Sequence, residues 1–141
     1  MIEKVGHEVQ SEETLLVKIS VKGPDESPEV VKVELLSFND YYFLYEHTCD
    51  VFDYQEMRES QGLTPQFVEY LTMLIKLFNK AIDNPDTYRL ATQLNRDNSA
   101  DLFFNQILPY KQLQLLGIHF AIGEETRIEK HIKYRHQISR L

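Results

Sequence analysis

The spacing of apolar residues changes twice along this 141-residue chain, and these changes constrain the fold more than any other feature. In residues 15–22 and 29–35 apolar and polar side chains alternate, as they do in half-buried antiparallel strands. Residues 23–28 between them have the composition of a loop, so the two segments are predicted to form a β-hairpin. Further strands are expected at 41–45, which is rich in aromatic residues, and within 2–9.

The middle of the chain has a helical period instead. Asp50 and Asp53 are placed to cap a short helix, which Gly62 would end. Thr64 is the predicted N-cap of a second helix, with Pro65 at its first position. Apolar residues three and four positions apart predict that one face of this second helix belongs to the core. The residues expected to be buried are Phe67, Leu71, Leu74, Ile75 and Phe78.

The last third returns to strands. Segments 87–94, 102–107 and 111–122 are predicted to be antiparallel. Strict alternation fails near Gln114 and Leu115, which indicates a β-bulge at that point.

These elements predict one α+β domain over residues 1–141. A helix-turn-helix in the middle of the chain would pack on an antiparallel β-sandwich of about seven strands. A C-terminal helix is expected over about 124–141, where basic residues accumulate toward the end of the chain.

Composition excludes several classes of protein. Hydrophobic residues make up 43% and charged residues 26%, which is the balance of a packed domain and not of a disordered chain. The net charge of −7 argues against a nucleic-acid partner, because a phosphate backbone would be repelled. There is one cysteine, and the sequence shows neither a signal peptide nor an apolar run long enough to span a membrane. A soluble cytosolic protein is therefore expected.

No catalytic motif is found, so the chain is not predicted to be an enzyme, and no cofactor or metal is expected. His131 and His136 are five positions apart and would lie on different faces of a helix, which disfavours a metal site. Cys49 and His47 could be a nucleophile and its base, but nothing in the sequence orients them, and a buried structural thiol is the favoured interpretation. His119 lies in a predicted strand and is expected to be solvated or hydrogen-bonded locally.

The connection between the last two strands is unusual. It reads Leu108-Pro109-Tyr110, whereas tight hairpin turns usually contain Gly, Asn or Asp. Two interpretations are open. The tip folds back onto its own domain, or it contacts another molecule.

Several strings of the sequence occur in the same order, and with matching spacing, in one known family. Residues 40–45 read Asp-Tyr-Tyr-Phe-Leu-Tyr, and Ser60-Gln61-Gly62-Leu63 precedes a helix with a Phe and Leu stripe. Residues 108–123 are followed by Ile128-Glu129-Lys130. The chain thereby resembles the globular head of the centriolar cartwheel protein, spindle assembly abnormal protein six.

Departures from the family pattern limit what the resemblance implies. Tyr41 replaces the usual Pro, Ser60 the first Gln, and Tyr110 the hairpin Phe. The family's long coiled coil is missing. The chain is therefore similar either to an excised head, whose C-terminal helix would lead into that coiled coil, or to the shorter spindle-assembly-like paralogue, which has no coil.

The resemblance implies the fold of the end-joining-scaffold head superfamily and a structural, non-enzymatic function. Heads of the family pair through the hairpin aromatic and build the nine-fold cartwheel of centrioles, basal bodies and flagellar bases. By resemblance, the dimer interface would contain Tyr110, Leu108, Pro109 and Lys111. The expected partners are a second copy and other centriolar or basal-body proteins, in the cytoplasm and cytoskeleton. The alternative is a scaffold head of the same fold in another complex, such as DNA end joining.

Overall fold

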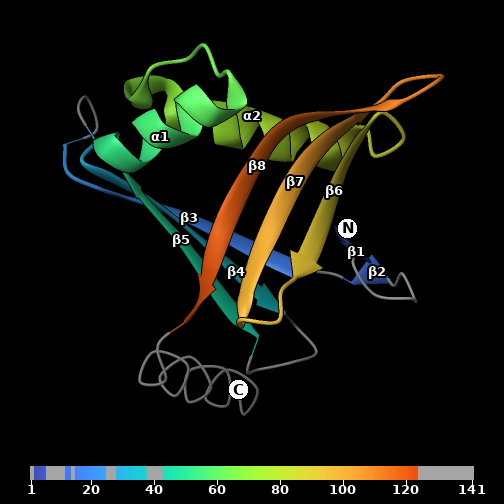
Figure 1. Ribbon diagram of the computed structural model, residues 1–141, viewed down its shortest axis with the longest axis horizontal. Helices are drawn as coiled ribbons and strands as arrows, with labels where there is room; N and C mark the ends of the chain where they lie inside the picture. The colour runs from blue at the N-terminus through green and yellow to red at the C-terminus, as the bar shows by residue number, and fades with distance from the viewer. Residues whose placement is uncertain (1, 6–11, 14, 25–27, 38–42, 124–141) are drawn as a thin grey trace.

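The computed structural model describes residues 2–5, 12–13, 15–24, 28–37 and 43–123 (Figure 1). The described chain contains strands, two α-helices and one 3₁₀ helix. In chain order these elements are β1 (Ile2–Val5), β2 (Glu12–Glu13), β3 (Leu15–Lys22), β4 (Val30–Ser37), β5 (Leu44–Asp50), α1 (Val51–Gln61), the 3₁₀ helix η1 (Phe67–Glu69), α2 (Tyr70–Asp83), β6 (Tyr88–Leu94), β7 (Ser99–Ile107) and β8 (Gln112–Ile122).

The described strands form a single hydrogen-bonded sheet in the order β2-β1-β6-β7-β8-β5-β4-β3. Six of them, from β6 to β3 in that order, are antiparallel, whereas β1 is parallel to β6. The α+β class is therefore confirmed. The arrangement differs from the expected sandwich of about seven strands, because β8 hydrogen-bonds to β5 and so joins two halves, β2-β1-β6-β7-β8 and β5-β4-β3, into one sheet.

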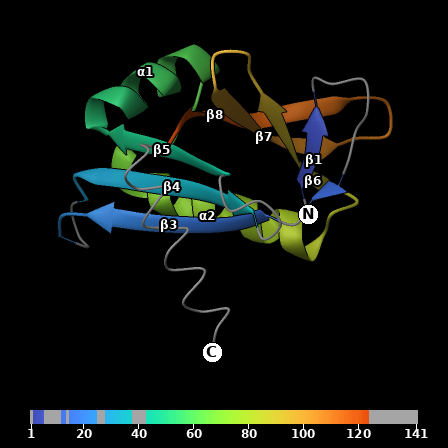
Figure 2. The ribbon, with the colours of Figure 1, turned by 90° about the horizontal axis from the view of Figure 1, so that it is seen from below.

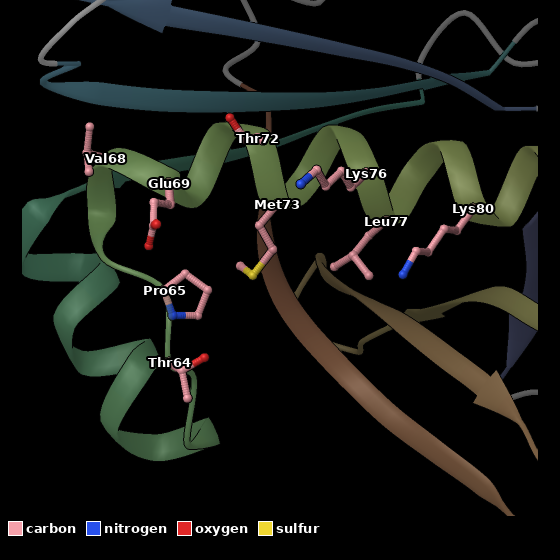
Figure 3. A pocket seen from close by; sticks show the side chains of 9 residues that line it. All are labelled: Thr64, Pro65, Val68, Glu69, Thr72, Met73, Lys76, Leu77 and Lys80. Carbon is pink, nitrogen blue, oxygen red and sulfur yellow. The ribbon is translucent and has the colours of Figure 1, made fainter.

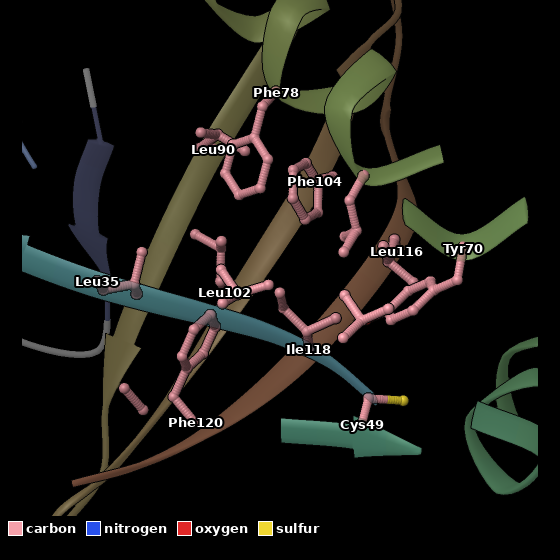
Figure 4. Close-up of a cluster of buried hydrophobic side chains, with 14 of the residues drawn as sticks. Leu35, Cys49, Tyr70, Phe78, Leu90, Leu102, Phe104, Leu116, Ile118 and Phe120 are labelled. Atoms are coloured by element: carbon pink, nitrogen blue, oxygen red, sulfur yellow. The ribbon is translucent and has the colours of Figure 1, made fainter. Parts of the chain in front are cut away.

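The two halves cross each other at a steep angle, as Figure 1 shows, with β3, β4 and β5 passing behind β6, β7 and β8. Strands β5 and β8 join the halves by pairing at two positions, Tyr45 with Ile122 and Glu46 with Ala121. The core lies between the halves and beneath α2 (Figure 4). Its largest fully buried side chains include Tyr54, Tyr70, Phe120, Leu35, Leu74, Leu102, Leu116 and Ile118.

The predicted hairpin of the first third is confirmed as β3 and β4, which pair along eight residues. The third long strand differs from its prediction. The strand extends to Asp50, well beyond the predicted end at residue 45, and residues 41 and 42 lie outside the described residues. Polar residues such as Glu46 and Thr48 interrupt the apolar pattern, so the sequence does not indicate this part of the strand. Continuous pairing with β4 holds these residues extended.

The caps of α1 follow the sequence. The Asp50 side chain accepts a hydrogen bond from the Asp53 amide at 2.8 Å, and the Asp53 carboxylate accepts one from the Asp50 amide at 3.2 Å. Gly62 ends the helix in the left-handed region at φ 68°, a conformation that costs glycine little. The predicted bulge is confirmed as well. Phe104 pairs with Leu116 and Asn105 with Gln114, so Leu115 is the extra residue.

The predicted start of the second helix is wrong. Neither Thr64 nor Pro65 is helical, and the chain enters η1 at Phe67 before α2 begins. The Tyr54 hydroxyl donates a hydrogen bond to the Pro65 carbonyl at 2.8 Å, so that carbonyl is held against α1. The Gln66 amide then donates to the Glu69 carboxylate at 2.8 Å, which stabilises the later start.

The buried face of α2 is also displaced from the predicted one. Leu74 and Phe78 are buried as expected, but Ile75 is 44% exposed. Tyr70, which the apolar pattern leaves out, is fully buried. The reason is that the Tyr70 hydroxyl has a buried hydrogen-bond partner, so its ring takes a core position that a purely apolar pattern does not reveal.

The predicted C-terminal helix lies outside the described residues and stays a prediction, as does the single-domain boundary that includes it. Within the described chain, neither α-helix has the length and apolar character needed to cross a bilayer.

A candidate interface at the hairpin tip

The β7–β8 hairpin carries the apolar tip singled out in the sequence. Ile107 pairs with Gln112, so residues 108–111 form the tip. The Leu108 amide donates to the Lys111 carbonyl at 2.8 Å, which closes the turn. The Ile107 amide donates to the Thr87 carbonyl at 2.6 Å and ties the base of the tip to the start of β6. The tip is therefore held by backbone hydrogen bonds without glycine.

Tyr110 is 100% exposed, so its side chain does not fold back onto its own domain. Pro109 and Lys111 beside it are exposed, and Leu108 is half-buried. In Figure 1 the tip projects away from the sheet beyond the end of α2. This geometry presents a large aromatic ring to other molecules.

A groove lies along η1 and α2. Its volume is about 580 Å³, and Figure 3 shows Pro65 facing the Met73 side chain, with Leu77 next to Met73 further along α2. Glu69 and Lys80 are among the charged residues on its rim. The remaining lining residues are Thr64, Val68, Thr72 and Lys76.

Sequence reasoning missed this groove. Met73 and Leu77 are four positions apart, which is the helical spacing used to identify the core, but they lie on a second apolar stripe of α2. A signal was available, since α2 has more apolar residues than one face can bury. Both Ile75 and Ile82, for example, are left exposed.

The buried histidine and cysteine of β5 have structural surroundings. His47 Nδ1 lies 2.9 Å from the His119 carbonyl oxygen, and its Nε2 lies 2.8 Å from the Tyr70 hydroxyl. Both ring nitrogens are thus engaged by groups other than a thiol. Cys49 is buried, and burial raises the pKa of its thiol to about 12, so the thiol stays protonated at neutral pH. A buried structural thiol fits these observations, and a nucleophile does not.

Among the described residues, the remaining candidate histidine is His119. His119 is exposed and its Nδ1 lies 2.7 Å from an Asp101 carboxylate oxygen, which is the local hydrogen bond that was expected. His131 and His136 lie outside the described residues. In the described ranges, no three His, Cys, Asp or Glu residues are grouped in a way that could hold a metal ion.

A bent, mostly antiparallel sheet, two helices inserted after its first half and a protruding hairpin with an exposed aromatic tip define an α+β head domain. Comparison with protein families identifies it further. The chain belongs to the family described as the centriolar protein SAS N-terminal domain, which matches residues 1–120. The family predicted from the sequence strings is thereby confirmed.

Solved structures share the fold. An N-terminal fragment of Leishmania SAS-6 containing part of its coiled coil has a TM-score of 0.78 and 20% identity, covering 97% of this chain and 76% of the fragment. A Drosophila melanogaster Sas-6 fragment, dimerised via its coiled-coil domain, has a TM-score of 0.78 and 14% identity, covering 99% and 69%. An N-terminal coiled-coil dimer of C. elegans SAS-6 has a TM-score of 0.74 and 13% identity, covering 98% and 83%. No curated protein matches the chain.

Proposed function

We propose that this chain is a structural, non-enzymatic self-assembly module whose heads pair through the tip of the β7–β8 hairpin. The observation that carries the proposal is the fully exposed Tyr110, held on a turn that its own backbone closes. Membership of a centriolar family supports the same function. The assembly would be the cartwheel or a related centriole, basal-body or flagellar-base structure, with other centriolar proteins as further partners.

The groove on η1 and α2 is the proposed binding site for Tyr110 of a second copy. Its apolar residues Pro65, Met73 and Leu77 would cover the ring, and its rim offers charged groups to the tyrosine hydroxyl. A hydroxyl without such a partner would weaken the contact. In a two-fold dimer each copy would contribute one tip and one groove, with Leu108, Pro109 and Lys111 beside the ring.

Such a contact would be weak. Burying one aromatic side chain is worth roughly 1.5–3 kcal/mol by area, whereas association costs several kcal/mol. Isolated heads are therefore expected to pair only at micromolar to millimolar concentration. If the C-terminal helix leads into a coiled coil, as in the Leishmania and Drosophila fragments, each dimer would present two heads and local concentration would drive assembly.

Sedimentation over a concentration series tests this proposal. Tyr110→Glu places a charge in an apolar binding site, and an unpaired charge there costs more than the small affinity available, so dimerisation should vanish. Tyr110→Phe keeps the ring and should keep or tighten pairing. Phe52→Glu is the matched control, because Phe52 is also an exposed aromatic, at 78%, and lies on α1. It should associate like wild type.

The groove is tested by mixing variants. Met73→Glu should abolish pairing alone, but an equimolar mixture with Tyr110→Glu restores one intact contact, between Tyr110 of the first variant and the groove of the second. Partial association of the mixture is expected. Wild type that stays monomeric at millimolar concentration, or a Tyr110→Glu variant that pairs normally, would contradict the proposal. Melting curves verify that each variant is folded.

The scaffold alternative, in a complex such as DNA end joining, has less support. The net charge of −7 opposes contact with DNA, and the family matched is centriolar.

A further inference from the structure

A second groove lies on another side of α2 and is lined by different residues from the first. It has a volume of about 370 Å³ and runs between the first half of β3 and the second half of α2. Ile75 and Ile82 of α2 are 44% and 69% exposed there, and Leu16 of β3 is 43% exposed. The groove is therefore apolar and open to solvent.

The strand beside this groove is the last in the sheet. Among the described residues β3 pairs with β4 on one side, and no strand pairs with its other side. Figure 2 shows β3 as the outermost strand, with α2 behind it. An unpaired strand edge presents backbone N–H and C=O groups in a row, which another strand can complete.

The two faces of β3 have different chemistry. Val17 and Ile19 face the core side and line the groove. Lys18 and Lys22 alternate with them and are exposed on the other face. A second β3 would bring its own lysines to the same face, and like charges on neighbouring strands destabilise a pair. On this face Glu34 of β4 lies opposite Lys18, but the charged residues that β3 itself contributes are lysines, so its free edge disfavours a second copy and favours an acidic strand.

We propose that the edge of β3 and the adjoining α2 groove bind an extended segment of a partner protein that alternates apolar and acidic residues. Its backbone would add as a further strand beside β3. Its apolar side chains would enter the groove against Ile75 and Ile82, and its carboxylates would lie beside Lys18 and Lys22. This surface is separate from the hairpin tip, so the inference does not depend on head pairing.

The whole chain carries a net charge of −7, so an acidic peptide is not attracted without a local basic site. This makes the probe selective. The probe is a blocked seven-residue peptide that alternates Glu and Val, with Glu at both ends. A matched peptide has Lys in place of each Glu. Titration of the isotope-labelled full chain by amide NMR is the measurement.

The expected result is a saturable set of shifts on β3 and on the second half of α2 with the acidic peptide only. Lys18→Glu combined with Lys22→Glu should weaken binding by about tenfold or more and should reverse the preference toward the lysine peptide. Ile75→Glu should also weaken it. Val51→Glu is the matched control, because Val51 is 48% exposed and lies on α1. This variant should bind the acidic peptide as tightly as wild type.

No shift at millimolar acidic peptide, equal binding of both peptides, or shifts confined to the hairpin tip would overturn the proposal. A peptide that binds as a helix, seen in its transferred NOEs, would refute strand addition. Concentration-dependent shifts or broadening of the β3 resonances in the free protein would show that a second copy covers the edge, which would also overturn the proposal.

Discussion

At the scale of single residues, His47 connects three elements. It lies in β5, its Nδ1 contacts the His119 carbonyl of β8, and its Nε2 contacts the Tyr70 hydroxyl of α2. A carbonyl can only accept, so Nδ1 carries a proton. Burial lowers the pKa of His47 from the usual 6.5, so the imidazole is neutral at neutral pH and Nε2 accepts from the Tyr70 hydroxyl.

Removing the hydroxyl should destabilise the fold. Tyr70→Phe leaves a buried ring nitrogen of His47 without its donor, which should lower the free energy of unfolding by about 1–3 kcal/mol. Chemical denaturation measures the change. Tyr110→Phe is the control, because its hydroxyl is fully exposed and its loss should have almost no effect on stability. Equal stabilities of the two variants would show that the buried hydrogen bond contributes nothing.

The lowered pKa of His47 also predicts a pH dependence. As pH falls, the unfolded chain takes up the proton first, near pH 6.5, while the folded chain resists it. The stability that depends on neutral His47 is therefore complete above about pH 6.5 and is lost as pH falls toward the lower pKa of the folded state. His47→Gln should flatten the stability profile across this window. Denaturation of wild type and of the variant at a series of pH values measures the difference, and identical profiles would contradict the prediction.

At the scale of elements, α2 has three apolar stripes. One packs on the core through Tyr70, Leu74 and Phe78, and the other two line the two grooves. A helix of 14 residues with apolar side chains on so much of its surface buries only part of them within its own domain. The exposed remainder is the basis of both binding proposals.

Two neighbouring substitutions separate the core stripe from a groove stripe. Leu74→Ala removes a fully buried side chain and should cost about 2–5 kcal/mol, as core truncations do. Ile75→Ala removes a side chain that is 44% exposed and should cost much less, under about 1.5 kcal/mol. Chemical denaturation of the pair tests the assignment. The reverse order of the two losses would mean that α2 is rotated from the position described.

At the scale of the whole molecule, the joint between the two halves of the sheet is narrow. Gly123 follows β8 and donates its amide to the Leu44 carbonyl at 2.9 Å. A Cβ at Gly123 would lie 2.7 Å from a Leu44 methyl carbon, and Leu44 is itself buried. The close approach of β8 to β5 therefore requires glycine at this position.

Enlarging this glycine should loosen the joint. Gly123→Ala is expected to lower the free energy of unfolding by about 1–3 kcal/mol, because buried Leu44 has to move. Ala121→Val, two residues earlier and exposed, should have little effect. Thermal melts compare the two. If Gly123→Ala melts like wild type, Leu44 is free to move aside and the joint is not tight.

Features that depend on neighbouring residues could be predicted from the sequence. The cap of α1 by Asp50, its end at Gly62 and the bulge at Leu115 each rest on residues a few positions apart, whose geometry the backbone dictates. The apolar hairpin tip belongs to the same group. Its exposure is confirmed at Tyr110, while its part in an interface stays a prediction.

Features that depend on distant residues were decided only by the tertiary structure. The late start of α2 follows from Tyr54 binding the Pro65 carbonyl, and the burial of Tyr70 in place of Ile75 follows from His47, 23 positions away. The joining of the two halves, and hence the single sheet, also rests on contacts across the chain. The sequence shows which residues are apolar and how they are spaced. Which of them are buried depends on which elements contact one another, and only the tertiary packing determines those contacts.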